Sequence, residues 1–210
     1  MGRKEDILKK SFNLHDLIQE VKNLQNVKLV SKIIEIRDPY TSGHQEKVAK
    51  LAVNIAQELG CPPPVIKSIY IASLLHDIGK IAIPIEILNK PGKLSKPEFE
   101  LIKTHPLTGY NLLCDVDFDY PISEIILQHH ERIDGSGYPN GLKGDEIYLE
   151  AKIIAVADVV EAMNAHRPYR PSLGIEAALR EIEAGLGKIY DQEAANACLL
   201  LLKKNKFTLS

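Results

Sequence analysis

Apolar residues recur at spacings of three and four along most of the chain, which is the pattern of amphipathic helices. The pattern marks six segments: residues 48–59, 65–75, 122–130, 153–163, 173–186 and 191–202. Pro97 opens a further helix, at a position where its missing N–H costs little. Residues 80–84, KIAIP, have the composition of a strand but are too short to build a sheet. The pattern predicts an all-α fold.

The first thirty residues differ from the rest. Their apolar positions form an a/d seam of the kind seen in coiled coils, made of Leu14, Leu17, Val21 and Leu24. Lys28 interrupts this seam. Two interpretations remain open, a helix that packs on its own domain and a short dimerising or signalling helix. We divide the chain into an N-terminal amphipathic helix, residues 1–30, and a main domain, residues 31–210.

The composition is that of an ordinary globular protein, with 45% hydrophobic and 26% charged residues. A formal net charge of -2 gives no global basic field, so we expect no DNA binding. No apolar run approaches the ~18 residues that a membrane span needs, and no apolar segment follows the charged start. The three cysteines are far apart and are expected to be reduced thiols. These features predict a cytoplasmic protein without membrane insertion or a signal peptide.

Candidate chemistry lies where histidines and aspartates interrupt apolar helices. His76 and Asp77 follow the apolar run 69–75, and His129 and His130 follow the run 122–128. Burying such groups costs free energy unless partners satisfy them, and a shared metal ion is an economical partner. Asp158 makes the same point, because it stands among alanine, valine and isoleucine in the helix 153–163.

The donor types restrict the metal. Imidazoles and carboxylates without a nearby cysteine suit iron, manganese, zinc, cobalt or nickel. The donors exceed what one ion needs, so two ions that share a carboxylate would use them well. Asp77 is the natural bridge, because it adjoins a histidine and lies centrally in the set.

Two segments resemble a known family. Residues 74–80, LLHDIGK, resemble the HD superfamily of metal-dependent phosphohydrolases, and residues 129–139, HHERIDGSGYP, resemble its HD-GYP subfamily. The resemblance extends over residues 38–202 and includes the segments DPYTSGH (38–44), KTHPLTGY (103–110) and ADVVEAM (157–163). The HD pair alone is a weak signal, whereas the two segments at this separation are very specific.

The resemblance implies a helical bundle that hydrolyses cyclic di-GMP to linear pGpG, and in some relatives on to GMP. One metal would be held by His76, Asp77 and Asp158. A second would be held by His105, His129 and His130, with Asp77 bridging, and His44 matches a further ligand position. Some relatives bind a third metal through a Glu where this chain has Tyr40, so we expect two divalent ions, iron or manganese.

In this reading a bridging hydroxide attacks the phosphodiester, and Asp77 and Lys80 are the catalytic residues. Lys80 is expected to point its ammonium at a phosphate oxygen. Candidate substrate contacts are Tyr138, Arg167, Tyr169 and Arg170. The arginines suit phosphate or a guanine face, whereas Tyr138 is expected either to contact guanine or to anchor its loop. Glu131 and Asp134 are expected to orient ligating imidazoles.

Two alternatives to this enzyme stay open. In the first, the chain is a metal-containing receptor for cyclic di-GMP with little turnover. In the second, it is a phosphodiesterase for another cyclic dinucleotide. The expected partners are cyclic di-GMP, a second copy bound through the N-terminal helix, and an upstream sensor or GGDEF-type protein.

Overall fold

The computed structural model describes residues 14–37, 43–165 and 172–204, with side-chain environments from residue 24 onward. Within these ranges the regular structure is helical, and extended pairing is limited to two isolated bridges, Asp134 with Lys143 and Leu186 with Tyr190. The helical fold confirms the all-α prediction.

The elements follow one another along the chain with short connections. In order they are α1 (Leu14–Arg37), α2 (His44–Glu58), α3 (Pro63–Leu75), η2 (Ile78–Ala82), α4 (Ile85–Leu88), α5 (Lys96–Ile102), α6 (His105–Leu113), α7 (Ile122–Gln128), η3 (Gly144–Glu146), α8 (Leu149–Asn164), α9 (Ile175–Gly185) and α10 (Gln192–Lys203).

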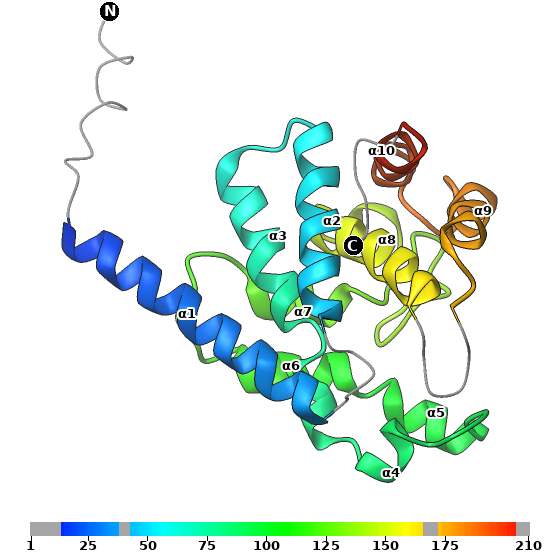
Figure 1. Cartoon of the computed structure of the whole chain (residues 1–210), viewed down its shortest axis with the longest axis horizontal. Helices are drawn as coiled ribbons and strands as arrows, with labels where there is room; N and C mark the ends of the chain where they lie inside the picture. The colour runs from blue at the N-terminus through cyan, green and yellow to red at the C-terminus, as the bar shows by residue number, and fades with distance from the viewer. Residues whose placement is uncertain (1–13, 38–42, 166–171, 205–210) are drawn as a thin grey trace, which may run out of the picture.

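Helices α2 and α8 form the centre of the core, where they pack on each other and on α3 and α10 (Figure 1). On α2 the side chains of Val48, Leu51 and Ile55 are fully buried, at the spacings that the sequence pattern predicted. On α8 the buried face includes Ile154 and Val160. Each such side chain contributes roughly 1.5–3 kcal/mol by leaving water, so this layer fixes the two helices relative to each other.

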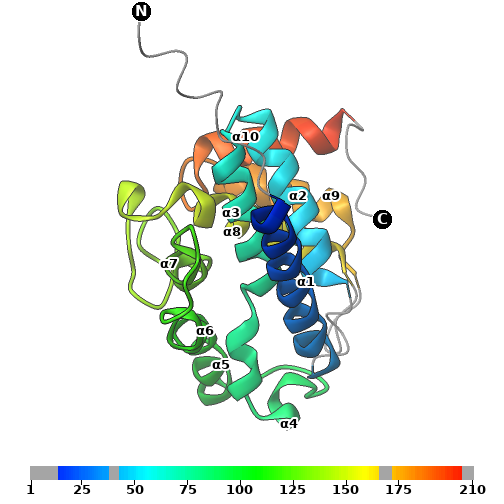
Figure 2. The same cartoon turned by 90° about the vertical axis from the view of Figure 1, so that its left-hand side faces the viewer.

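Two smaller groups of helices flank this centre. Helices α9 and α10 contact each other and α8 on one side (Figure 1). Helices α5, α6 and α7 form a column on another side (Figure 2), in which α6 packs against both α7 and η2. The short element η2, which contains most of the KIAIP segment, is a 3₁₀ turn. Helix α6 therefore lies beside the turn that joins α3 to η2. The apolar pattern did not predict α6.

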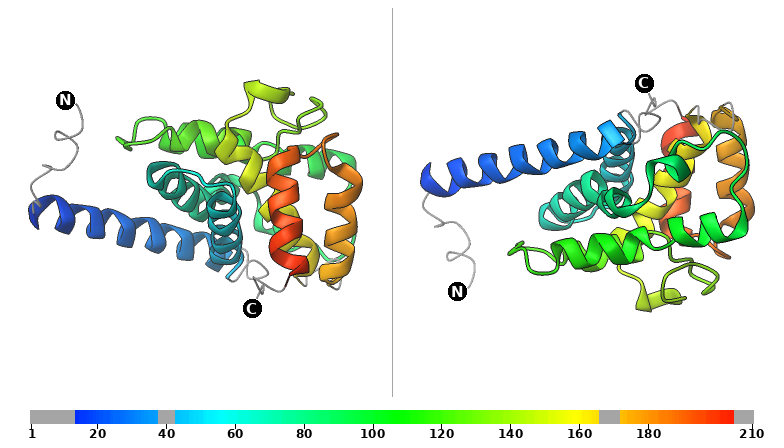
Figure 3. Two further views of the ribbon diagram at one scale, coloured as in Figure 1. Left: turned by 90° about the horizontal axis from the view of Figure 1, so that it is seen from above. Right: turned by 90° about the horizontal axis from the view of Figure 1, so that it is seen from below.

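Helix α1 runs without interruption to Arg37, past the boundary placed at residue 30. Val27 and Ile34 are buried where the helix packs against α3 and η2, and its first turns extend beyond the other helices (Figure 3). The division into residues 1–30 and 31–210 remains a prediction. Among the helices of the described residues, none combines the length and apolarity needed to cross a bilayer.

Candidate metal centre

The seven predicted metal ligands come together from the ends of helices and from the middle of α8. His44 and His105 are the first residues of α2 and α6, and His76 and His129 are the residues at which α3 and α7 end. Asp77 and His130 follow the last two, and Asp158 lies within α8. The set spans more than a hundred positions of sequence, and the core packing brings it to one place.

The first group of donors is His44, His76 and Asp77, whose donor atoms all lie within 4.8 Å of one another. Asp158 joins this group from α8. Its Oδ1 lies 3.3 Å from Nε2 of His44 and 4.0 Å from Nε2 of His76. The four side chains offer two imidazole nitrogens and two carboxylates to one point, which suits a divalent cation.

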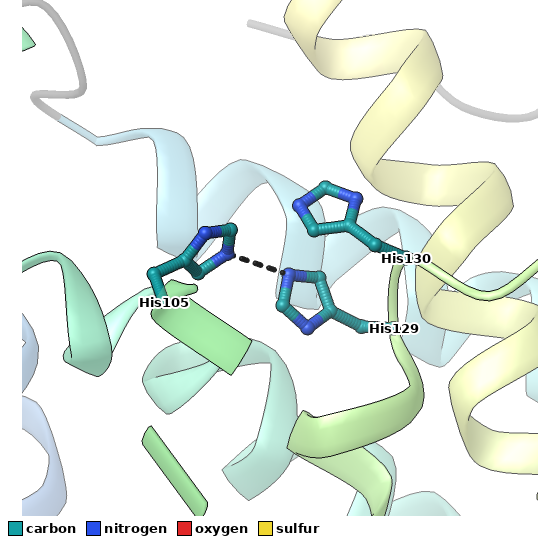
Figure 4. A group of neighbouring side chains, drawn as sticks. All are labelled: His105, His129 and His130. Carbon is teal, nitrogen blue, oxygen red and sulfur yellow. Dashed lines mark hydrogen bonds between the residues drawn. The ribbon is translucent and has the colours of Figure 1, made fainter. Parts of the chain in front are cut away.

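The second group consists of His105, His129 and His130 (Figure 4). The Nε2 atoms of His105 and His129 are 3.2 Å apart, which is the contact drawn as a dashed line in Figure 4. The His130 ring lies 4.0 Å from the His129 ring and 5.0 Å from the His105 ring, measured between centroids.

Asp77 connects the two groups with its two oxygen atoms. Its Oδ2 lies 3.5 Å from Nε2 of His76 and 3.8 Å from Nε2 of His44. Its Oδ1 lies 3.4 Å from Nε2 of His105 in the second group. One carboxylate thus faces both groups, one oxygen toward each.

The hydrogen bonds of the histidines assign the tautomer that metal binding requires. Nδ1 of His76, His105 and His129 faces the carbonyl oxygen of Ser73, Ile102 and Ile126, respectively, at 2.7, 2.8 and 2.5 Å. A carbonyl only accepts, so each Nδ1 carries the proton and each Nε2 presents a lone pair. In metal proteins the ring nitrogen away from the metal makes this kind of bond.

The Nε2 lone pairs of these histidines converge on positions that a cation would satisfy. Two acceptor nitrogens 3.2 Å apart, those of His105 and His129, cannot bond to each other. The Nε2 of His76 is buried and has no hydrogen-bond partner among the described residues. A buried acceptor without a partner costs roughly 1–3 kcal/mol, so the donor set fits bound metal ions.

The charges of the site match this reading. Burial alone would raise the pKa of Asp77, but the Lys80 ammonium and the neighbouring histidines hold that pKa well below the usual range of aspartate. Burial also opposes ionisation of Asp158, yet the hydrogen bond and the charge of His44 contribute most to holding the pKa of Asp158 low.

The histidines of the second group are shifted toward the neutral form. Burial lowers the pKa of His105 to about 4, so this imidazole is neutral at pH 7. Burial likewise holds the pKa values of His129 and His130 well below the usual range of histidine.

The other predicted site residues fall into two sets. Nζ of Lys80 donates to Oδ2 of Asp77 at 2.8 Å, so its ammonium lies at the edge of the first group. Arg167, Tyr169 and Arg170 lie outside the described residues, so their proposed substrate contacts remain predictions. Tyr40, which stands where some relatives have the ligand of a third metal, also lies outside them.

Tyr138 of the GYP segment packs on the second group. Its ring stacks on His130 with centroids 4.7 Å apart and an angle of 28°, and burial raises the pKa of its hydroxyl. Gly137 permits this placement, because a Cβ there would lie 2.4 Å from the Cα of Glu131 and from the backbone nitrogen of Arg132. The GYP loop therefore packs closely against the backbone of Glu131 and Arg132, just after α7.

The structure shows other roles for Glu131 and Asp134 than the expected orientation of imidazoles. The buried carboxylate of Glu131 accepts from the backbone N–H of Asn140 at 2.7 Å and of Leu142 at 3.1 Å. Asp134 accepts from the backbone and the hydroxyl of Ser136. Both acidic residues shape the loop behind the second group.

The carboxylate that accepts from the Nδ1 of an imidazole is Glu161, which sequence reasoning missed. It lies on α8 one turn after Asp158 and accepts from Nδ1 of His44. Only 4% of its surface is exposed. The signal in the sequence was a second acid, three residues after Asp158, within a helix whose other positions are largely apolar.

Comparison with known proteins places this geometry in a family. The family model described as HD domain matches residues 28–194. The cyclic di-GMP phosphodiesterase response regulator RpfG of Xanthomonas campestris is 41% identical over 182 residues, covering 86% of this chain and 48% of the relative. A cyclic di-GMP phosphodiesterase of Thermotoga maritima is 44% identical over 182 residues, covering 85% and 49%.

A solved structure has a similar fold. It belongs to a cyclic GMP-AMP specific phosphodiesterase of V. cholerae, is 32% identical, has a TM-score of 0.55, and covers 87% of this chain and 42% of that one. The chain spans about half the length of the curated relatives that it matches. The chain therefore belongs to the HD domain family, within which its HHE and GYP sequences match the HD-GYP pattern.

Proposed function

We propose that this chain is a metal-dependent phosphodiesterase that hydrolyses cyclic di-GMP to linear pGpG. The observation that carries the proposal is the carboxylate of Asp77, whose two oxygens face two separate groups of metal donors. The names of relatives at 41% and 44% identity support the substrate. A site for two neighbouring cations is suited to in-line displacement at a phosphodiester.

The first position would be held by His44, His76, Asp77 and Asp158, and the second by His105, His129 and His130 with Asp77 shared. Divalent ions bound there supply Lewis acidity, which activates water near neutral pH and offsets negative charge on the phosphodiester. We propose iron or manganese, because imidazole and carboxylate donors suit both.

The protein's own groups prepare the site for an anionic substrate. Asp77 and Asp158 stay ionised, so they hold cations without having to lose a proton. Lys80 donates to Asp77 at the edge of the site, from where its ammonium can reach a phosphate oxygen once cations neutralise that carboxylate. We propose that Arg167, Tyr169 and Arg170 contact the second phosphate or the guanines, and that Tyr138 supports His130.

The test is an anaerobic incubation of iron- or manganese-loaded protein with cyclic di-GMP, followed by chromatography. The proposal predicts stoichiometric pGpG. Tight binding without pGpG or GMP would instead support the receptor. A higher kcat/KM for cyclic GMP-AMP would favour that substrate, for which the relationship to the V. cholerae enzyme is the supporting observation.

Two substitutions separate metal binding from turnover. Asp77→Ala should lose metal and activity together, because it removes the shared ligand. Lys80→Ala should keep its metals and lose roughly 10²–10³-fold in kcat, as expected when one charge-stabilising donor is removed. Lys90→Ala is the matched control, since Lys90 pairs with Glu98 in the first turn of α5 and its loss should leave kcat unchanged.

We further propose that α1 pairs with a second copy of the chain. Leu29, Ile33 and Ile36 are exposed by 58%, 46% and 77% and recur at spacings of four and three, on the side of α1 opposite the buried Val27 and Ile34. A helix with apolar residues on both faces is suited to a partner. Sedimentation of wild type and of Ile33→Glu tests this proposal. Wild type should be a dimer and the variant a monomer, and an equal mass for the two proteins would contradict the pairing.

A further inference from the structure

Three of the buried histidines obtain their Nδ1 partner from their own stretch of chain. His76, His105 and His129 each bond to the carbonyl oxygen three residues earlier. Those carbonyls belong to the last turns of α3, α5 and α7, where C=O groups lack partners within the helix. A histidine that ends a helix, or follows its last turn, is therefore held by a backbone carbonyl that has no other partner within the helix.

His44, the first residue of α2, has a side-chain partner at Nδ1. Its Nδ1 bonds to Oε2 of Glu161, 117 residues away on α8. Both side chains are buried, with 3% and 4% of their surfaces exposed.

Helix α8 thus holds both sides of one imidazole ring. Asp158 and Glu161 lie three residues apart and so share a face of the helix. Asp158 lies 3.3 Å from Nε2 of His44, and Glu161 bonds to Nδ1 on the other side of the ring. Glu161 therefore lies behind the ring, away from the point on which the metal donors converge.

We propose that Glu161 is a positioning residue that makes the two metal positions unequal. It fixes His44 with Nε2 toward the first group. It is also the anionic acceptor among the Nδ1 partners of these four histidines, the other three being neutral carbonyls. An anionic acceptor makes an imidazole a stronger donor. The first position therefore binds a divalent cation more tightly than the second. This inference rests on the proposed metal centre and not on the identity of the substrate.

The test measures Mn²⁺ binding to the full, metal-stripped chain by equilibrium dialysis, without any turnover assay. Wild type should bind two ions in two resolved steps. Glu161→Gln keeps an oxygen acceptor and removes the charge, so the tighter step should weaken by about 10-fold. Glu161→Ala removes the acceptor as well, so that step should weaken by about 100-fold. The weaker step should stay unchanged in both variants, because Glu161 bonds to no donor of the second group.

Glu131→Gln is the matched control, because Glu131 is also buried but bonds to backbone N–H groups of a loop. It should lower the melting temperature and leave both binding steps in place. Unchanged binding in Glu161→Gln and Glu161→Ala would overturn the proposal. So would equal weakening of both steps, or a wild type that binds no Mn²⁺. Two unequal steps in a protein that hydrolyses no cyclic dinucleotide would refute the proposed function and leave this inference standing.

Discussion

Gly79 lets η2 approach the backbone of His105 closely. Replacing Gly79 with alanine should lower both the stability of the protein and its metal binding. A Cβ at Gly79 would lie 1.9 Å from the carbonyl oxygen of His105 and 2.6 Å from the backbone nitrogen of Gly109. These neighbours are backbone atoms, so no change of rotamer relieves the overlap. Since Cβ atoms essentially never approach closer than 3.0 Å, η2 and α6 must separate by about 1 Å.

The expected magnitudes follow from that displacement. Overpacking a dense core costs about 1–3 kcal/mol or more. For a chain of this size each kcal/mol lowers Tm by roughly 2–4 °C, so Tm should fall by about 2–12 °C. The same movement carries His105 away from Asp77 Oδ1, from which it is now 3.4 Å. A misplacement of ~1 Å at a catalytic group costs about 10²-fold in rate, and the second ion should bind more weakly.

Thermal melting and metal analysis of Gly79→Ala provide the assay, and Gly109→Ala is the control from the same contact. A Cβ at Gly109 would meet the methyl groups of Ile126 and Ile78 at 3.2 and 3.3 Å, which are side-chain atoms that can shift. Alanine there also favours the helix by about 1 kcal/mol, so this variant should stay near wild type. A Gly79→Ala protein with wild-type Tm and two bound ions would refute the reasoning.

Three further predictions test other parts of the structure. Glu131→Ala removes the acceptor of two backbone N–H groups, so it should cost ~1–3 kcal/mol and speed hydrogen exchange at Asn140 and Leu142; unchanged exchange at these amides would contradict the assigned role. Burial raises the pKa of Cys198 to about 12, so at pH 8 a disulfide reagent should modify the exposed Cys114 rapidly and Cys198 only after unfolding. Fast reaction of a folded Cys114→Ser variant at Cys198 would show that this thiol is accessible. Chelation of metal-loaded protein should lower Tm, because ions bind only the folded donor set, and added Mn²⁺ should restore it; an unchanged Tm would argue against bound metal.

The apolar pattern predicted the long helices well and the elements around the site poorly. The buried faces of α2 and α8 are continuous and contain few polar interruptions, so their period is plain in the sequence. Helix α6 is only nine residues long and contains a proline, a glycine and an asparagine. Its position is fixed by packing on η2 and α7, which is long-range information that a local pattern does not contain.

The candidate ligands could be chosen from sequence because charged and imidazole groups at the ends of apolar helices demand partners. Their grouping could not be chosen without the family resemblance, since it depends on how four helix ends meet. Glu131 and Glu161 show the limit. Both are buried acids near ligands, yet one anchors a loop and the other holds an imidazole. Only the position of the nearest acceptor or donor in space separates the two roles.

We propose that imidazoles and carboxylates from separate helices enclose a pair of cations that share Asp77. Anomalous diffraction from crystals of the Mn²⁺-loaded protein measures this directly. Two anomalous peaks are expected, one among His44, His76 and Asp158 and the other among His105, His129 and His130, with Asp77 between them. A single peak, or peaks away from Asp77, would contradict it.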